Sequence, residues 1–334
     1  MNLRTYPEIL RYTAFTTDPA GGNPAGVVLD AAAMDDAAML AIAAEVGYSE
    51  TAFVMAADHA ARRFRLRFFS PLAEVAFCGH ATVATAVALA ERTGPGPLVF
   101  DTPVGEIALD TSAEPDGSVT ATLTSVPTRS RPAVDEEVNA SLAALHWSPE
   151  DLDPALPPHV AFGGNEHLVL AVATRERLAA LDYDFDALAE VMHRHGWTTL
   201  QLVWRETGNL FHARDPFPIG GVVEDPATGA AAAALGGYLR TLGALPPSGA
   251  FTIRQGEDLG RLSLLRVEAS PHGPPRAGER AGGGDRGHGR RRGGVNTPPV
   301  RRTPDRWGTR PRPLPGVRYG PGPGVRYGPG RFPR

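Results

Sequence analysis

Alternating apolar and polar residues predict several short strands in the first 270 residues. The clearest lies at residues 62–69, where Phe64, Leu66 and Phe68 share one face and arginines occupy the other. Further apolar runs of strand length occur at 104–109, at Ala161 with 167–173, at 198–204 and at 262–267. This part of the chain is therefore expected to be rich in β-structure.

The spacing of apolar residues also predicts three helices. Residues 35–47 begin with two aspartates that can cap a helix, and they end at a glycine. The apolar face of this helix consists of Met39, Ile42, Ala43 and Val46. The other two helices, 80–92 and 229–242, are alanine-rich on every face, so we expect both to be buried on all sides.

The two alanine-rich helices have similar surroundings in the sequence. Each follows a polar turn (CGH at 78–80, EDPATG at 224–229) and lies downstream of a Gly-Asn turn that enters an apolar strand (GGNPAGVVL at 21–29, GGNEHLVLAV at 163–172). The chain therefore resembles one α/β unit used twice. We expect halves at 1–128 and 129–270, each with strands around one central helix.

Composition removes several classes of mechanism. The 334 residues include no lysine, which excludes a Schiff-base or pyridoxal-phosphate lysine and a Walker-type phosphate loop. The single cysteine excludes a disulfide framework, a structural zinc site built on cysteines and any two-thiol mechanism. No run of about 18 apolar residues occurs and the first ten residues do not resemble a signal peptide, so we expect a cytoplasmic protein without a membrane span.

The formal net charge of −4 combines two unlike stretches. Residues 1–270 contain 18 arginines against 34 acidic residues, whereas residues 271–334 contain 15 arginines against 3. The second stretch also has 16 glycines and 13 prolines, so we expect it to be disordered. One interpretation is an arginine-rich arm that binds nucleic acid. We favour another, a sequence translated in a shifted frame, which would leave the second half without its last strand.

Candidate chemistry gathers near the starts of the two buried helices. Helix N-termini offer unpaired N–H groups that suit a bound carboxylate, and the two starts would converge if the halves face each other. Such a cleft would hold His80 and Asp225, with Glu50 supplied from the loop after the first helix. Glu50 opens an apolar strand, where partial burial would make its carboxyl group suitable for acid–base work, although a solvated loop acid is the simpler alternative.

The other candidates also have simpler interpretations. Asp225 can be a helix cap, and His80 can cap or pack. We favour Cys78 as a small buried apolar residue rather than a reactive thiolate. The His193 and His195 pair has no acidic partner at matching spacing, and we expect it on the surface rather than at a metal.

Five motifs in this order resemble those of the PhzF-like isomerases of phenazine biosynthesis. They are GGNPAGVVLDA, AIAAEVGYSETAFV, FRLRFFSPLAEVAFCGHATVATA, VVEDPATGAAAAALGGYL and IRQGEDLGR, spread over residues from about 10 to 268. The resemblance implies an α/β (α+β) fold of the diaminopimelate-epimerase type, with two similar halves that each wrap a curled mixed sheet around a central helix. It also implies a homodimer without cofactor or metal.

The resemblance assigns roles to residues that match the motifs. Glu50 matches the catalytic acid/base of the family, and His80 and Asp225 match its catalytic residues that position and polarise the substrate. The expected substrate-binding residues are Ser49, Gly79, Thr228 and Gly229. The prototype of the family moves a proton within dihydro-3-hydroxyanthranilate.

The reaction class follows from the number of proton-transferring groups. Two-sided epimerases commonly use paired thiols, but the place in the second half that corresponds to Cys78 holds Ala227 and Thr228. This favours a proton shift by one carboxylate on a small carboxylate substrate. The alternatives are an amino-acid epimerase and a non-catalytic protein whose tail binds nucleic acid. The acidic first 270 residues are not expected to bind nucleic acid. Ala230 stands where the family commonly has serine, so the substrate itself stays unassigned.

Overall fold

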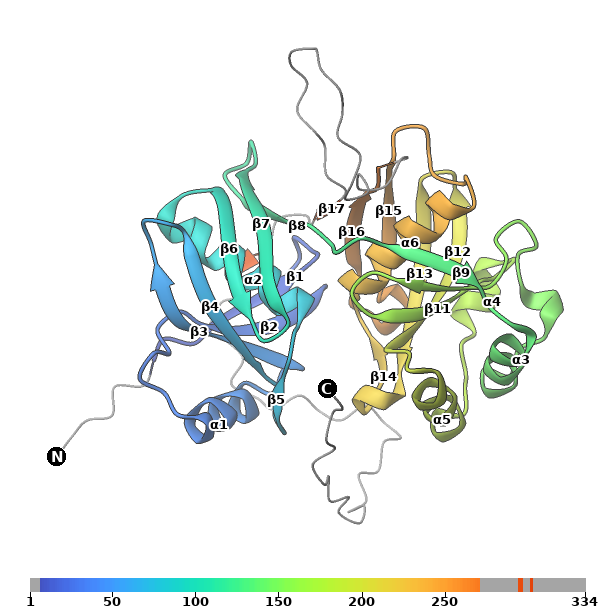
Figure 1. The fold of residues 1–334 in the computed structure, drawn as a ribbon, viewed down its shortest axis with the longest axis horizontal. Coiled ribbons are helices and arrows are strands. Elements are labelled where there is room, and N and C mark those ends of the chain that lie inside the picture. The colour runs from blue at the N-terminus through green and yellow to red at the C-terminus, as the bar shows by residue number, and fades with distance from the viewer. Residues whose placement is uncertain (1–6, 271–293, 297–300, 303–334) are drawn as a thin grey trace, which may run out of the picture. The chain divides into compact units, whose positions relative to one another are not determined.

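The computed structural model describes residues 7–270, 294–296 and 301–302. Strands dominate, as the sequence predicts (Figure 1). The elements of the first half are β1 (Leu10–Ala14), β2 (Asn23–Val28), α1 (Asp36–Val46), β3 (Glu50–Asp58), β4 (Arg63–Phe69), β5 (Glu74–Val75), α2 (Gly79–Thr93), β6 (Gly96–Thr102), β7 (Gly105–Ala113) and β8 (Val119–Leu123).

The second half adds more helices to a similar framework. Its elements are β9 (Arg129–Pro132), α3 (Asp135–Ala144), β10 (His159–Phe162), β11 (Glu166–Ala171), α4 (Arg175–Ala179), α5 (Phe185–His195), β12 (Thr199–Thr207), β13 (Leu210–Phe217), β14 (Val222–Asp225), α6 (Gly229–Thr241), β15 (Ala250–Gln255) and β16 (Ser263–Glu268), followed by β17 (Gly294–Asn296) and β18 (Arg301–Arg302). Three short 3-10 turns lie at Pro149–Asp151, Pro218–Gly220 and Glu257–Leu259.

Strand pairing repeats between the halves. In the first sheet, β1–β2 is antiparallel, β2–β3 parallel, β3–β4 antiparallel, β4–β6 parallel, and β6–β7 and β7–β8 antiparallel. The second sheet has the same series through β10, β11, β12, β13, β15, β16 and β17. The short strands β5 and β14 occupy matching places against β4 and β13. The predicted fold of two similar halves is confirmed.

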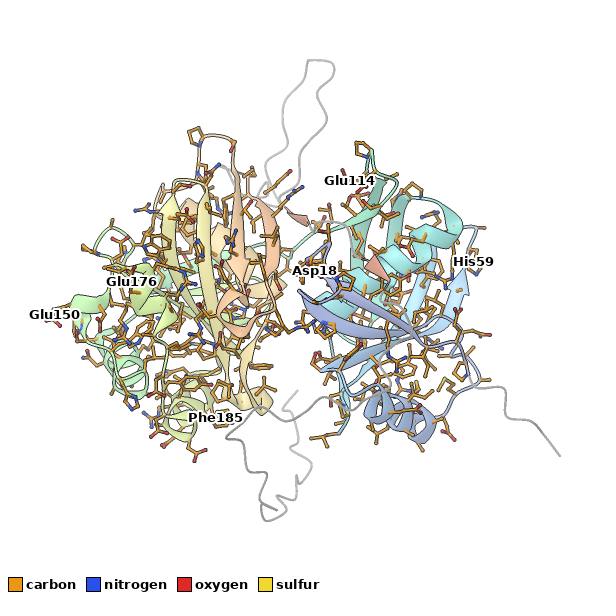
Figure 2. All side chains as sticks on the ribbon, turned by 180° about the vertical axis from the view of Figure 1, so that it is seen from behind. Asp18, His59, Glu114, Glu150, Glu176 and Phe185 are labelled. Carbon is orange, nitrogen blue, oxygen red and sulfur yellow. The ribbon has the colours of Figure 1, made fainter. Side chains whose placement is uncertain are left out.

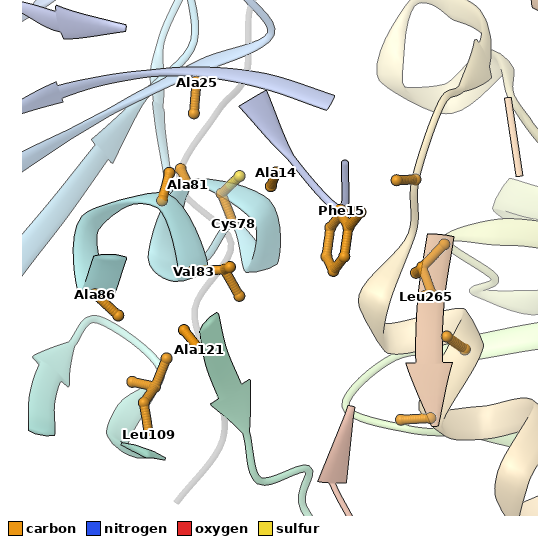
Figure 3. Close-up of a cluster of buried hydrophobic side chains, with 14 of the residues drawn as sticks. Ala14, Phe15, Ala25, Cys78, Ala81, Val83, Ala86, Leu109, Ala121 and Leu265 are labelled. Carbon is orange, nitrogen blue, oxygen red and sulfur yellow. The ribbon is translucent and has the colours of Figure 1, made fainter. Parts of the chain in front are cut away.

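Each sheet surrounds one of the alanine-rich helices. Helix α2 is buried at every position from His80 to Ala90, and α6 from Ala231 to Leu239, as predicted from their composition. Both helices belong to one continuous apolar core, and Figure 3 shows part of it around Cys78, Ala25 and Ala81. Small side chains all round these helices let the strands approach from every side.

Other helices cover separate clusters. Asp35 caps α1 by accepting a hydrogen bond from the Ala38 amide, and Gly47 ends the helix at φ 69°. The predicted apolar face of α1 is buried with Phe53 and Phe69 of β3 and β4. Helices α3 and α5, which the sequence analysis did not foresee, pack together in a second-half cluster that includes Trp147, Leu188 and Met192. Figure 2 labels Phe185 at the start of α5, a large apolar side chain that remains partly exposed.

Two short strands from beyond residue 270 connect the halves. β9 opens the second half and pairs with β10, the first strand of the second sheet. β18 pairs with β1, the first strand of the first sheet. β17 pairs with β16 on one side and with β8 on the other, which joins the two sheets (Figure 1).

These two short strands differ from the expectation for the 271–334 tail. The sequence analysis expected no structure there and a second sheet without its last strand, whereas β17 supplies that strand and β18 an additional pairing. The rest of the tail lies outside the described residues, so disorder and frame-shifting there stay predictions, as do the half boundaries. In the described part of the chain, no helix is long and apolar enough to cross a membrane.

Candidate active site

Glu50, Cys78 and His80 form one cluster in the first half. Glu50 begins β3 just after the Gly47 end of α1, and Cys78 and His80 lie at the start of α2. The Glu50 Oε2 atom is 3.4 Å from His80 Nε2 and 3.5 Å from Cys78 Sγ. Ser49 Oγ is 3.3 Å from the same His80 nitrogen. The structure therefore brings together three predicted site residues, Ser49, Glu50 and His80, with the thiol of Cys78 as a fourth member.

Burial differs sharply within this cluster. The side chains of His80 and Cys78 are 7% and 6% exposed, whereas that of Glu50 is 21% exposed. Burial, together with the negative charge of Glu50, raises the pKa of the Cys78 thiol well above its ordinary value. The thiol is therefore protonated at neutral pH, in agreement with its interpretation as a buried apolar residue. Among Glu50, Cys78 and His80, the side chain of Glu50 has the most access to a substrate.

Asp225 and Thr228 form a second cluster before α6. Thr228 Oγ1 donates to Asp225 Oδ2 at 2.7 Å. Gln255, at the end of β15, donates from Nε2 to the Asp225 carbonyl at 2.9 Å and accepts from the Thr228 amide at 3.1 Å. Thr228 occupies the N-cap position of α6, as Cys78 does for α2. The turn is thus held by hydrogen bonds that leave the helix start in a fixed place.

Asn23 connects the first half to this second cluster. Its Nδ2 donates to Asp225 Oδ1 at 2.8 Å and to the Ala227 carbonyl at 3.3 Å. From the second half, Arg261 donates to the carbonyls of Gly21 and Gly22 at 2.8 and 3.0 Å. Asn23 belongs to the Gly-Asn turn of the sequence analysis but was not among its predicted site residues.

The electrostatics of the two clusters are coupled. Burial raises the pKa of Asp225, and the charge of Glu50 raises it further. The charge of His80 acts in the opposite direction, as do the hydrogen bonds from Thr228 and Asn23. The side chains of His80 and Glu50 therefore lie close enough to Asp225 for their charges to act on it. A shared cleft between the two helix starts stays a prediction.

Asp215 is a buried acid that the sequence analysis missed. It is fully buried on β13 and is the cross-strand partner of Asp225 on β14. With its amide nitrogen toward the carboxyl group, Gln201 donates to both Asp215 oxygens, at 3.1 and 2.9 Å. Burial raises the pKa of Asp215 well above its ordinary value, and the neighbouring Asp225 charge adds to the rise. Two adjacent carboxyl groups in this partly dry environment do not both ionise cheaply, in agreement with the raised pKa of both Asp215 and Asp225.

The glycines at the two helix starts leave room for a ligand. A Cβ atom added to Gly79 would meet nothing within 4 Å, and one added to Gly229 would first meet Phe15 at 3.7 Å. The predicted substrate-binding places are thus open beside both helix N-termini. His193 and His195 lie instead in the last turn of α5, where the His195 ring stacks on Trp197. The roles of all these site residues stay predictions.

Comparison with known proteins agrees with the fold and the motifs. Residues 12–280 match the family model described as phenazine biosynthesis-like protein. An uncharacterized isomerase of Mesorhizobium japonicum is 35% identical over 85% of this chain and 96% of its own length. The trans-2,3-dihydro-3-hydroxyanthranilate isomerase of Pseudomonas chlororaphis is 32% identical over 77% of this chain and 88% of its own.

A solved structure supports the same assignment. A predicted epimerase from Pseudomonas aeruginosa superposes with a TM-score of 0.72 at 26% identity, covering 90% of this chain and 98% of that one. The fold is thus of the curled, two-half type that the resemblance implies. The chain belongs to the phenazine biosynthesis-like (PhzF) family and is an isomerase.

Proposed function

We propose that this isomerase moves a proton between two carbons of a small carboxylate substrate, with Glu50 as the single acid/base. The reaction would be like that of the trans-2,3-dihydro-3-hydroxyanthranilate isomerase of Pseudomonas chlororaphis. The substrate would be a small cyclic amino or hydroxy acid bound between the two helix starts. No cofactor or metal takes part in the proposed step.

The observation that carries the proposal is the asymmetry between the two N-cap positions. Cys78 caps α2, but its counterpart before α6 is Thr228, whose hydroxyl group is engaged by Asp225. A threonine hydroxyl held in this way is no base, so the site lacks the second thiol that a two-sided exchange needs. Glu50 alone is partly exposed and ionisable at the centre of the cluster, which favours transfer on one face of the substrate.

The neighbouring groups have distinct tasks in this scheme. The Glu50 carboxylate accepts a proton from one substrate carbon and returns it to another carbon on the same face. His80, 3.4 Å from Glu50, stabilises negative charge that develops between the two transfers. Asp225 orients a polar substrate group, and its own position is fixed by Asn23 and Thr228. The free N–H groups at Gly79 and Gly229 bind the substrate carboxylate.

The test is turnover by Glu50→Gln on candidate dihydro-hydroxy acids. The variant keeps the shape of the side chain but removes the base, and positioned acid–base catalysis contributes about 10²–10⁴-fold, so kcat should fall by at least about 100-fold. Glu45→Gln is the matched control, because Glu45 is an exposed glutamate on α1 outside the site. Wild-type turnover by Glu50→Gln would refute the proposal.

Amino-acid epimerisation is the second candidate. It is separated from the proton shift by proton NMR of amino acids in deuterated water, where an epimerase exchanges the α-proton and inverts the centre. Exchange that depends on Cys78 rather than on Glu50 would assign the thiol as a base. Ala230 bears on the substrate in either case, because it presents no hydroxyl group at the start of α6. Ala230→Ser is expected to alter KM among carboxylates more than kcat.

A further inference from the structure

The proton shift gives Asp215 no task, although this aspartate lies beside the candidate site residue Asp225. The register of β13 and β14 makes the two aspartates cross-strand partners, and the Cβ atoms of such partners are about 4.5–5.5 Å apart. The side chain of Asp215 is fully buried, whereas Asp225 is partly exposed. The two carboxyl groups are therefore neighbours, and Asp225 is the one with access to solvent.

The Thr228 hydroxyl group contacts both carboxyl groups. Its proton is donated to Asp225 Oδ2 at 2.7 Å, and Gln255 Nε2 donates to its oxygen at 3.1 Å. Asp215 is a further hydrogen-bonding partner of the same hydroxyl group. A hydroxyl group has one proton and two lone pairs, so these two bonds leave one lone pair. Asp215 can fill this lone pair only as a donor, which requires its protonated form.

Hydrogen-bond donors surround the rest of the Asp215 carboxyl group. Gln201 donates to both of its oxygens, and the Thr199 hydroxyl group is a further partner. His167 Nδ1 is 2.8 Å from Thr199 Oγ1, whereas His167 Nε2 is buried without a partner among the described residues. A buried orphaned N–H group is rarer than an orphaned acceptor, so we place the ring proton on Nδ1. Thr199 then accepts from His167 and donates to Asp215.

We propose that Asp215 is a positioning residue, which holds one proton at neutral pH, donates it to Thr228 and so keeps Asp225 as the charged member of the pair. A hydroxyl group that accepts a hydrogen bond becomes a stronger donor, so Thr228 binds Asp225 more firmly. Asp225 receives Thr228 on one oxygen and Asn23, at 2.8 Å, on the other, which fixes the plane of the carboxylate. That this carboxylate orients a substrate group rests on the proposed function, whereas the proton on Asp215 does not.

The charges packed around Asp215 oppose its ionisation. Asp225 and Glu224 both act on it with negative charge, and Glu224 is itself bridged to Arg214. His167, on the far side of Thr199, is uncharged at neutral pH because burial lowers its pKa to about 4. Burial and these negative charges raise the pKa of Asp215, which agrees with a retained proton.

Asp225 faces a different set of groups. Burial raises its pKa and the Glu50 charge raises it further, but the charge of His80 lowers it. The hydrogen bonds from Thr228 and Asn23 lower the pKa as well, because they stabilise the carboxylate. A cation and two donors thus favour the anion at Asp225, and the shared proton belongs on Asp215.

Carbon-13 NMR of the full chain, labelled at the aspartate carboxyl carbons, measures both titrations without a substrate. Asp215→Asn and Asp225→Asn assign the two signals. We expect the Asp215 signal to keep its protonated position at pH 7 and the Asp225 signal to be ionised there. Thr228→Val should raise the midpoint of the Asp225 titration by about one pH unit or more, because a hydrogen bond to a charged group is lost.

Thr241→Val is the matched control. The Thr241 hydroxyl group donates to the Gly237 carbonyl near the other end of α6, so its removal should leave both midpoints unchanged. An ionised Asp215 or a protonated Asp225 at pH 7 would overturn the proposal. An Asp225 midpoint that Thr228→Val leaves in place, or that Thr241→Val shifts equally, would overturn the role of Thr228.

Urea unfolding gives a second measurement that does not depend on assigning signals. Asparagine copies a protonated aspartic acid, with a donor for Thr228 and an acceptor for Gln201. The unfolded chain releases the Asp215 proton that the folded chain keeps, so this group lowers wild-type stability as the pH rises from 4 to 7. The stability of Asp215→Asn relative to the wild type should therefore increase over this range. An Asp215→Asn chain that does not fold, or whose relative stability is the same at both pH values, would overturn the proposal.

Discussion

The two halves contain the same arginine–glutamate pair in two different environments. Arg67 and Glu74 flank the β4–β5 pairing, and Arg214 and Glu224 hold the matching places beside the β13–β14 pairing. Both arginines donate to their glutamate from Nε and Nη2. The first-half side chains are 26% and 38% exposed, whereas those of Arg214 and Glu224 are 10% and 1% exposed. The two halves therefore allow the contribution of this ion pair to stability to be compared in an exposed and in a buried environment of the same protein.

Glu224→Gln should destabilise the protein far more than Glu74→Gln. Removing one partner of a buried ion pair costs about 3–5 kcal/mol, because the other charge stays buried without compensation. Arg214 would keep only carbonyl partners, Leu178 and Ala179. An exposed pair contributes about 0.2–1 kcal/mol, and Arg67 would also keep Asp36 at 2.7 Å.

Urea unfolding of both variants, followed by circular dichroism, measures the difference. The free energies of unfolding should separate by at least about 2 kcal/mol, with equal dependence on urea concentration. Arg214→Met combined with Glu224→Leu should recover much of the loss, since paired apolar residues need no compensation. Equal costs for the two single variants would refute the reasoning that burial sets the strength of this pair.

Three other outcomes follow from the structure. Burial lowers the pKa of His167 from 6.5 to about 4, so between these pH values the unfolded chain binds a proton that the folded chain does not. The free energy of unfolding of the wild type should therefore fall by about 3 kcal/mol as the pH drops from 6.5 to 4. Unfolding curves of His167→Asn should show a smaller fall. Gly22 and Gly47 have φ of 65° and 69°, but a Cβ at Gly22 would lie 2.3 Å from the Ala14 carbonyl while one at Gly47 meets nothing within 4 Å. By thermal unfolding, Gly22→Ala should therefore cost about 1–3 kcal/mol more than Gly47→Ala, and equal costs would show that the turn yields. A chain ending at residue 270 lacks β17 and β18, so size-exclusion chromatography should find more aggregation than for a chain ending at 303; identical behaviour would mean that these strands protect no edge.

Local signals in the sequence predicted the elements that depend on local interactions. Helix α1 was predicted with its cap, its apolar face and its terminal glycine, because each of these acts within a few residues. The burial of α2 and α6 on all sides could be predicted from their alanine-rich composition, because a helix that is apolar on every face is usually buried. Helices α3 and α5 were missed: they cover the outer face of the second sheet, and the repeat of the first half offered no template for that layer.

The structure brings the predicted residues Glu50 and His80 together, but the residues that hold the candidate site in place were not predicted from the sequence. Glu50, His80 and Asp225 lie at helix and strand ends, where a polar residue beside an apolar run stands out. Asn23 and Asp215 act through partners about 200 and 10 residues away in the chain, so no local pattern reports them. An aspartate within the apolar strand β13 was the one available signal for Asp215, and its interpretation required knowing that Asp225 lies opposite.

The pairings of β17 and β18 make the first sheet depend on residues far along the chain. Residues 10–123 are contiguous and leave the ribosome first, yet β1 receives the β18 partner from residues 301–302 and β8 receives β17 from residues 294–296. A nascent first half therefore carries two open strand edges until residues 294–302 have been made. Glu50 and His80 belong to this first half, and the edges of the sheet around them close only in a chain that has been translated past residue 302.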